Sequence, residues 1–254
     1  MQLDVTDLTV RYGALTVLDG VSFTVRAHDF WMLCGPNGAG KSTVVSALLQ
    51  AAPYKGDILL DGQRLSAMRP RARAHRIGFL QQTHAVGFAY AVEEVVRLGR
   101  YAYPSGGRGA ADDAAVEAAL RRTGMLEKRR QNVLTLSGGE LQRTFLAQLL
   151  AQDPPLIVLD EPANHLDPQY QRAVFTLLDE WRRQPGRAVV AVVHDVSLAR
   201  RFGTRALLLK NGKTLACGDP AEALSTANLS AAYDMDLSGW MRELSAPWNE
   251  RNET

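Results

Sequence analysis

Hydrophobic and polar residues alternate at the beginning of the chain. Leu3, Val5, Leu8 and Val10 are apolar, polar residues separate them, and the alternation resumes after a turn in the segment LDGVSFTVRAHD. A period of two is typical of a strand that buries one face and exposes the other. The pattern therefore predicts an antiparallel β-region at the N-terminus.

Three later segments are apolar almost without interruption: DFWMLCG, PLIVLDEP and AVVAVVHD. Such runs predict strands that are covered on both faces, as in a parallel sheet. The segment KSTVVSALLQA, which follows the first run, instead has the spacing of a helix. Its apolar residues on one face are Val44, Ala47, Leu48 and Ala51. Strands that alternate with helices predict an α/β fold.

Residues 88–154 have a different character, because the segments AVEEVVRLGR, ADDAAVEAALRRTGM and GGELQRTFLAQLLAQ all have helical spacing. This predicts a helical subdomain that is inserted into a β-rich core made of residues 1–87 and 155–220. Residues 221–254 are expected to form a helical segment and a polar tail, SAPWNERNET, that frays. The whole chain, 1–254, is expected to be one domain.

Composition and charge narrow the class of protein. The 254 residues are 46% hydrophobic and 22% charged, which is ordinary for a globular protein and excludes a disordered chain. The net charge of +2 gives no reason to expect nucleic-acid binding. Two cysteines, Cys34 and Cys217, predict no disulfide framework. No apolar stretch reaches the roughly 18 residues of a membrane span, and no signal peptide is evident, so a cytoplasmic protein is expected.

A glycine-rich stretch joins the first apolar run to the helix that follows it. It matches G-x-x-x-x-G-K-[ST] in full, with Gly35, Pro36, Asn37, Gly38, Ala39, Gly40, Lys41 and Ser42. Without side chains, backbone N–H groups can close around phosphate oxygens at the electropositive start of a helix. Lys41 is expected to reach the β- and γ-phosphates and Ser42 to bind Mg²⁺. Thr43 is expected to bond the α-phosphate. The pattern predicts an ATP site rather than a simple helix cap.

Two further motifs add chemistry to this site. The strand LIVLDEP ends in Asp160, which suits a Mg²⁺ ligand position, and Glu161, which is placed to polarise the water that attacks the γ-phosphate. In LSGGELQR, residues 136–143, Ser137 and Glu140 predict a capping box. The intervening Gly138 and Gly139 leave the amides of the first turn bare. This helix start is therefore a candidate second phosphate site.

With these three motifs in this order, the chain resembles the ATP-binding subunit of an ABC transporter over nearly its whole length. The resemblance implies a RecA-like P-loop NTPase core within the α/β fold, and an ATPase that uses Mg²⁺. It implies that Tyr12 stacks on adenine and that His194 contacts the γ-phosphate. Gln82 would link Mg²⁺ and the attacking water to the membrane-facing lobe, although the neighbouring Gln81 remains an alternative. On the same resemblance, Asp167, in NHLD, would belong to a loop that crosses between subunits.

The resemblance also implies partners. Two copies would pair head to tail, so that Ser137, Gly138, Gly139 and Glu140 of one copy cover the ATP held by the other. Integral membrane permease subunits and a separate solute-binding protein are expected, with the ATPase at the cytoplasmic face of the inner membrane. The segments AVEEVVRLGRYAYPS and STANLSAAYDM look like those of importers for iron chelates, haem and vitamin B12. The solute and the direction of transport stay open.

Two other functions compete with a transporter subunit. One is a soluble ABC ATPase without a membrane channel, such as the iron–sulfur cluster assembly type, which tends to differ from DEPANHLD in the acidic strand region. The other is an ABC protein that binds nucleic acid or ribosomes, for which the basic segment RPRARAHR, residues 69–76, is the best support. A solvated face or a contact with the permease accounts for that segment better, and no nucleic acid is expected.

Overall fold

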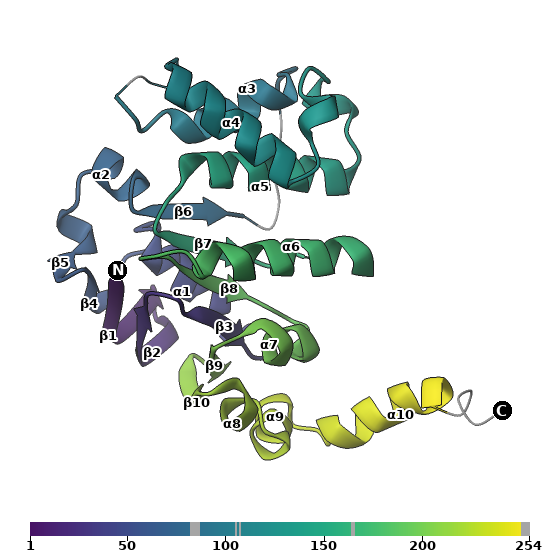
Figure 1. The fold of residues 1–254 in the computed structure, drawn as a ribbon. Helices are drawn as coiled ribbons and strands as arrows, with labels where there is room; N and C mark the ends of the chain where they lie inside the picture. Colours follow the sequence, from purple (N-terminus) through teal and green to yellow (C-terminus); the bar gives the residue numbers. More distant parts are fainter. Residues whose placement is uncertain (82–86, 105, 107, 164–165, 250–254) are drawn as a thin grey trace.

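The structure is a computed structural model that describes residues 1–81, 87–104, 106, 108–163 and 166–249. Two sheets form its frame (Figure 1). The first is antiparallel with strand order β2-β1-β4-β5, and the second has the order β10-β9-β3-β8-β7-β6. The strands of the first are β1 (Gln2–Tyr12), β2 (Leu15–Arg26), β4 (Lys55–Leu60) and β5 (Gln63–Arg64). Those of the second are β3 (Phe30–Cys34), β6 (Ile77–Leu80), β7 (Leu156–Asp160), β8 (Ala188–Val192), β9 (Arg205–Lys210) and β10 (Lys213–Gly218).

The helices cover the second sheet and extend from it. They are α1 (Lys41–Leu48), α2 (Pro70–Ala74), α3 (Val92–Arg97), α4 (Ala110–Arg122), α5 (Gly138–Gln152), α6 (Pro168–Arg182), α7 (Val196–Phe202), α8 (Pro220–Ala223), α9 (Thr226–Tyr233) and α10 (Leu237–Asn249). Short 3₁₀ turns are η1 (Leu65–Ala67), η2 (Leu98–Arg100), η3 (Leu126–Lys128) and η4 (Val133–Thr135). In Figure 1, α3, α4 and α5 gather beyond the β6 edge of the sheet. These features confirm the predicted α/β fold with its antiparallel region and inserted helices.

The core lies on both sides of β3, which is buried at all five positions. Phe30, Met32 and Cys34 belong to the hydrophobic cluster that includes the helices α5 and α6, whereas Trp31 and Leu33 belong to the cluster that includes the antiparallel sheet. A strand with both faces covered needs apolar residues at every position. This explains the continuous run in the sequence. Cys34 is fully buried in this strand, and burial raises the pKa of its thiol to about 12.

The alternation in β1 is interrupted once, and the interruption keeps the correct residues inside. Val5 and Leu8 are both buried although they are three positions apart, because the register with β2 shifts between them and Asp7 has a φ of 50°. A bulge of this kind inserts one extra residue into the strand, so that the apolar residues on both sides of it face the core. Gly56 of β4 lies against it, where a Cβ would come within 2.4 Å of the Thr6 carbonyl oxygen.

Two predicted boundaries are wrong. The first helix ends at Leu48, so Ala51 is exposed and contributes nothing to its buried face. Helix α10 extends to Asn249 and thus includes half of the stretch that was expected to fray. The apolar residues Leu237, Met241 and Leu244, which precede that stretch, lie one turn apart, and Trp248 follows at the same spacing in the sequence. Within the described ranges, no helix has the length and hydropathy needed to cross a bilayer.

Candidate functional site

Four neighbouring parallel strands end at one edge of the second sheet. In the order β3-β8-β7-β6, they lead into the glycine-rich loop, His194, the Asp160–Glu161 pair and Gln81. Ligands of open α/β sheets bind at this carboxyl edge. Segments that lie far apart in the sequence are therefore brought together by the strand order. Gln82 lies outside the described residues, so its placement and the choice between it and Gln81 stay predictions.

The glycine-rich loop needs glycine for steric reasons. Gly35 and Gly40 have φ values of 141° and 101°, which side chains rarely tolerate. A Cβ at Gly35 would lie 2.2 Å from the Leu209 carbonyl oxygen, and one at Gly40 would lie 2.5 Å from Cδ2 of Leu18. Strands β9 and β2 therefore press directly against the loop backbone. The middle of the loop, at Asn37 and Gly38, is exposed.

The helix after the loop begins without a side-chain cap. Gly40 is its N-cap residue in a left-handed conformation, no side chain accepts a hydrogen bond from the first turn, and this turn holds no acidic residue. Helix amides of the first turn lack partners within the helix, and the helix dipole makes this end electropositive. A loop of glycines that leads into such an end fits an anionic ligand such as a phosphate group.

Lys41 lies at this helix start and is only 6% exposed. Its Nζ donates to the carbonyl oxygens of Gly35 at 2.8 Å and Pro36 at 2.9 Å. Burial lowers the pKa of Lys41, and the nearby carboxylates of Glu161 and Asp160 oppose that shift. A buried ammonium group that is bonded to neutral carbonyls gains Coulombic attraction when an anionic oxygen replaces one of them.

Ser42 and Asp160 provide two oxygen ligands close together. The Ser42 hydroxyl donates to Oδ1 of Asp160 at 3.2 Å. Burial raises the pKa of Asp160, and the charge of Glu161 raises it further. A cation placed there would relieve this cost of burying two adjacent carboxylates. Hydroxyl and carboxylate oxygens suit Mg²⁺, which commonly takes one or two protein ligands and completes its shell with substrate phosphates and water.

Glu161 is held in a sparsely populated backbone conformation, with a φ of 55°. Non-glycine residues in this region are strained by roughly 1–3 kcal/mol, and such residues cluster at active sites. The Glu161 carboxylate, whose side chain is 10% exposed, bonds Nε2 of His194, whose side chain is 40% exposed. The parallel register pairs Asp160 with Val192 and so brings the two strand ends side by side. Glu161 and His194 thus form one unit at the mouth of the site.

The LSGGELQR segment forms the predicted capping box. Oγ of Ser137 accepts from the Glu140 amide at 3.3 Å, and the Ser137 amide donates to Oε2 of Glu140 at 2.9 Å. Lys128 forms an ion pair with Glu140. The Lys128 hydrogen bond and then the Ser137 amide lower the pKa of Glu140 to about 2. Among the described residues, no hydrogen bond or ion pair joins this turn to the glycine-rich loop of the same chain.

The remaining predicted residues lie near the edge of the site. Tyr12 is half exposed at the end of β1, opposite Leu15, in the hairpin whose second strand reaches Gly40. Its stacking role stays a prediction. Asp167 caps α6, since its side chain accepts from the Tyr170 amide at 3.0 Å. The preceding residues of NHLD, 164 and 165, lie outside the described part of the chain.

One contact at the site was not predicted. Nε2 of Gln142, in the first turns of α5, donates to the carbonyl oxygen of Pro162, which directly follows Glu161. It ties the capped helix to the catalytic strand end of the same chain. The sequence carries a signal for this residue, because Gln142 falls within LSGGELQR, but the partner is a backbone carbonyl and leaves no trace in the residue pattern.

The chain is similar to known proteins over most of its length. The model of the family described as "ABC transporter" matches residues 18–164. The chain is 42% identical over 231 residues to the hemin import ATP-binding protein HmuV of Streptomyces coelicolor, covering 91% of this chain and 82% of the relative. It is 39% identical over 237 residues to HmuV of Pseudomonas fluorescens, covering 91% and 92%. It is also 35% identical to the cobalamin import ATP-binding protein BtuD of Halobacterium salinarum, covering 92% of this chain and 59% of the relative.

Solved structures have the same fold. A metal-chelate type ABC transporter in an inward-facing conformation superposes with a TM-score of 0.79 at 26% identity, covering 91% of this chain and 88% of that one. A dimeric ATP-binding cassette bound to ADP and Pi after hydrolysis superposes with a TM-score of 0.77 at 25% identity, covering 86% of this chain and 98% of that one. These structures confirm the predicted core.

Proposed function

The chain belongs to the ABC transporter family and is one of its ATPases, and on that premise we propose that it powers the import of haem or a related metal chelate. The observation that supports ATP hydrolysis is where four groups meet. The glycine-rich loop, His194, the Asp160–Glu161 pair and Gln81 follow the carboxyl ends of β3, β8, β7 and β6. The proposal for the solute rests on the similarity to relatives that are named for hemin and cobalamin import.

The contacts within the site support the following roles for its residues. The amides of the loop and of the first turn of α1 bind the phosphates of ATP, and Lys41 exchanges its carbonyl partners for phosphate oxygens. Ser42 and Asp160 would hold Mg²⁺, which would supply positive charge to neutralise the phosphates. Glu161 accepts a hydrogen bond from the attacking water and orients it. His194, which is bonded to Glu161, holds that carboxylate in position.

A second copy of the chain completes the site. The Ser137 turn is a helix start that fits an anion, yet nothing in the described residues joins it to the loop of its own chain. Head-to-tail pairing would bring it over the γ-phosphate of the partner's ATP. Attraction between the bound phosphate and both helix starts would then close the dimer, and hydrolysis would release it.

The helices of residues 88–154 are proposed to contact permease subunits, which would hold this chain at the cytoplasmic face of the inner membrane. The exposed apolar residues of this part of the chain are consistent with a covered surface: Phe88, Tyr90, Leu98, Tyr101 and Leu134. The competing reading, an ABC ATPase that works without a membrane channel, predicts no stable association with membranes.

The test is co-purification followed by ligand-stimulated hydrolysis. The chain is expressed with its neighbouring permease, the complex is reconstituted in vesicles, and ATPase activity is measured with hemin, cobalamin or a ferric siderophore outside. We expect stimulation by one of the three solutes, with Lys41→Ala as the control that removes the activity. Recovery of the active ATPase only from the washed, membrane-free fraction would contradict the importer and support the channel-free alternative.

A further inference from the structure

The last turn of α5 is packed unusually closely from two sides. A Cβ at Gly78 of β6 would lie 2.3 Å from Cδ1 of Leu149, and a Cβ at Gly99 of η2 would lie 2.2 Å from the carbonyl oxygen of Gln148. Glycine at both positions therefore lets the core strand and the helical subdomain, residues 88–154, touch the same helical turn. Such close approach is a common structural reason for glycine inside a regular element.

Side chains of the helical subdomain bind the terminal carbonyls of this turn. The Tyr103 hydroxyl donates to the carbonyl oxygen of Gln152 at 2.9 Å, and Nη1 of Arg100 donates to that of Ala151 at 2.9 Å. The last carbonyls of a helix have no partners within it, so each of these bonds satisfies a group that would otherwise be left unpaired. The end of α5 is thus fixed to the segment that follows η2.

Two other bonds tie this junction to the core. Nε2 of Gln152 donates to the carbonyl oxygens of Ala74 at 2.6 Å and Ile77 at 3.0 Å, where α2 ends and β6 begins. From α2, Arg71 donates through Nε to the carbonyl oxygen of Ala102 at 2.7 Å and through Nη2 to that of Tyr103 at 2.8 Å. The same short segment therefore holds α5 on one side and α2 on the other.

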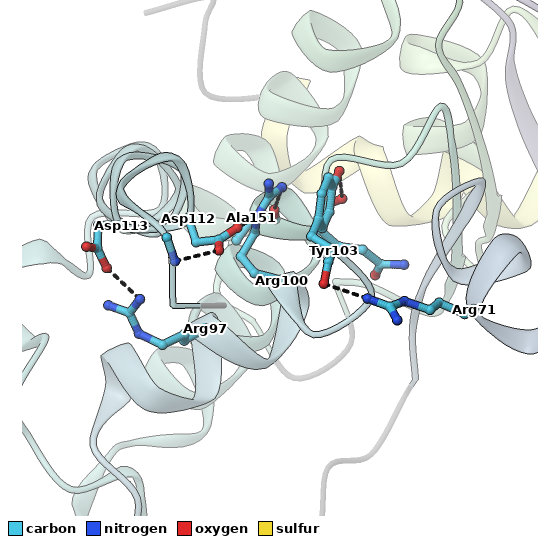
Figure 2. Close-up of polar contacts among 9 residues, drawn as sticks. Arg71, Arg97, Arg100, Tyr103, Asp112, Asp113 and Ala151 are labelled. Atoms are coloured by element: carbon cyan, nitrogen blue, oxygen red, sulfur yellow. Dashed lines mark hydrogen bonds and ion pairs between the residues drawn. The ribbon is translucent and has the colours of Figure 1, made fainter. Parts of the chain in front are cut away.

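A buried ion pair stiffens the centre of the junction. Arg100 bonds Oδ1 of Asp112 through Nε at 2.8 Å, and both residues are less than 10% exposed. The guanidinium group lies over the Tyr103 ring, 3.3 Å from its centroid. Figure 2 shows Arg100 between Asp112 and Tyr103, with Arg71 on the far side of Tyr103. Removing one partner of a buried pair is strongly destabilising, which makes this the rigid part of the junction.

The other end of α5 carries the Ser137 turn. With 15 residues at a rise of 1.5 Å, the two ends lie about 21 Å apart. Beyond the junction, only residues 153–155 separate α5 from β7, which ends in Asp160, and β6 leads directly to Gln81. A small rotation at the junction would therefore displace the Ser137 turn against the Gln142–Pro162 bond near that end of α5, while the attachment to β6 and β7 is kept.

We propose that this junction is the pivot of the helical subdomain, and that Tyr103, Gln152 and Arg71 are positioning residues that aim the Ser137 turn at the partner copy. The inference rests on the proposed nucleotide-dependent dimer. Loosening the pivot leaves the ATP-binding loop of each copy intact. It lowers the fraction of molecules in which α5 has the orientation that the closed dimer needs. The loss therefore falls on dimer formation rather than on nucleotide binding by the single chain.

The test uses the full chain with Glu161→Gln, which keeps ATP bound, and measures the ATP-dependent dimer by sedimentation velocity. Tyr103→Phe removes one hydroxyl and keeps the ring under Arg100. Its matched control is Tyr54→Phe, in the other half of the molecule, where the hydroxyl bonds Gln50. One hydrogen bond corresponds to about a two- to tenfold change in an equilibrium. We expect the dimer constant to weaken by this factor for Tyr103→Phe only.

Arg71 provides an exposed second variant that does not threaten folding. Arg71→Ala removes both bonds to the Tyr103 segment, whereas Arg69→Ala removes the same charge from a side chain without a hydrogen bond or ion pair among the described residues. The dimer is expected to weaken for Arg71→Ala and not for Arg69→Ala, with partial rescue by Arg71→Lys. Affinity for ADP, measured by calorimetry, is expected to stay the same in all variants.

The outcomes separate the pivot from the function on which it rests. If the Glu161→Gln chain forms no dimer with ATP, the proposed dimer itself is wrong. If it dimerises and the junction variants match their controls, or if ADP affinity falls in parallel with dimerisation, the pivot is wrong.

Discussion

Two helices of this protein begin at a sequence that we propose to bind phosphate, and they begin in opposite ways. Helix α1 follows Gly40, which is left-handed and provides no side-chain cap. Helix α5 follows Ser137, whose hydroxyl caps the Glu140 amide, while Glu140 bonds back to Ser137 and forms an ion pair with Lys128. Both starts are rich in glycine, so glycine content alone does not distinguish them.

The difference indicates which start can bind ligand alone. At α1, an electropositive helix start without a side-chain cap lies beside a buried ammonium group, so an anion is attracted by both. At α5, a capping box already satisfies part of the first turn, and that helix end is stable without ligand. The amides of Gly138 and Gly139, the first two residues of α5, are the groups that can bind a ligand there. We infer that α1 captures nucleotide and that α5 only completes a site already formed by a second copy.

Glu161→Gln is expected to have the largest effect, because it separates capture from turnover. Removing a general base costs roughly 10²–10⁴-fold in rate, and the amide cannot accept the proton of the attacking water. Steady-state hydrolysis should fall by this factor while ATP binding persists and the dimer accumulates with both helix starts engaged. Phosphate release and sedimentation measure the two quantities. Normal turnover would remove Glu161 from the assigned role, and an unchanged melting temperature is the control for folding.

Lys41→Ala tests the inference that the start of α1 captures nucleotide. Hydrogen bonds to charged groups are worth about 1.5–3 kcal/mol, so losing one predicts roughly 10- to 150-fold weaker nucleotide binding. Calorimetry with ADP measures this loss on the single chain, without dimerisation. The carbonyl oxygens of Gly35 and Pro36 also lose their donor, so thermal unfolding must be measured alongside. Unchanged ADP affinity would contradict the phosphate-binding role of the loop.

The two helix starts also show which features of the site could be predicted from the sequence. Local rules sufficed for both, because a capping box and a glycine-rich loop depend on residues within a few positions of each other. The Glu161–His194 pair required the order of the strands, which follows from packing between segments 33 residues apart. The junction at Gln152 could not be predicted, since its partners are the backbone carbonyls of Ala74 and Ile77, which every sequence possesses.

Ser137→Ala tests the inference that the start of α5 completes the nucleotide site of a second copy. Loss of an N-cap side chain costs about 0.5–2 kcal/mol, so the free energy of unfolding should fall by that amount. Binding of ADP to the single chain should stay the same, because no hydrogen bond or ion pair among the described residues joins this turn to its own loop. In the Glu161→Gln background, the ATP-dependent dimer should weaken beyond the stability loss. Ser225→Ala, which removes the corresponding cap of α9, is the matched control. A fall in ADP affinity for Ser137→Ala alone would erase the distinction between the two helix starts.

Glu140→Gln has the smallest expected effect and separates the cap from its charge. The pKa of Glu140 is lowered from 4.5 to about 2, chiefly by Lys128, so its contribution to stability is complete above pH 4.5 and is lost as the pH falls toward 2. Glutamine can still accept from the Ser137 amide but does not titrate. Denaturant unfolding measured from pH 6 to pH 2 should therefore show a shallower loss of stability for the variant. High salt should shrink the difference, because the Lys128 contact is partly exposed and screened. Identical pH profiles would mean that the cap is held by its hydrogen bonds alone, and the ion pair would then have no part in keeping the start of α5 formed before a partner arrives.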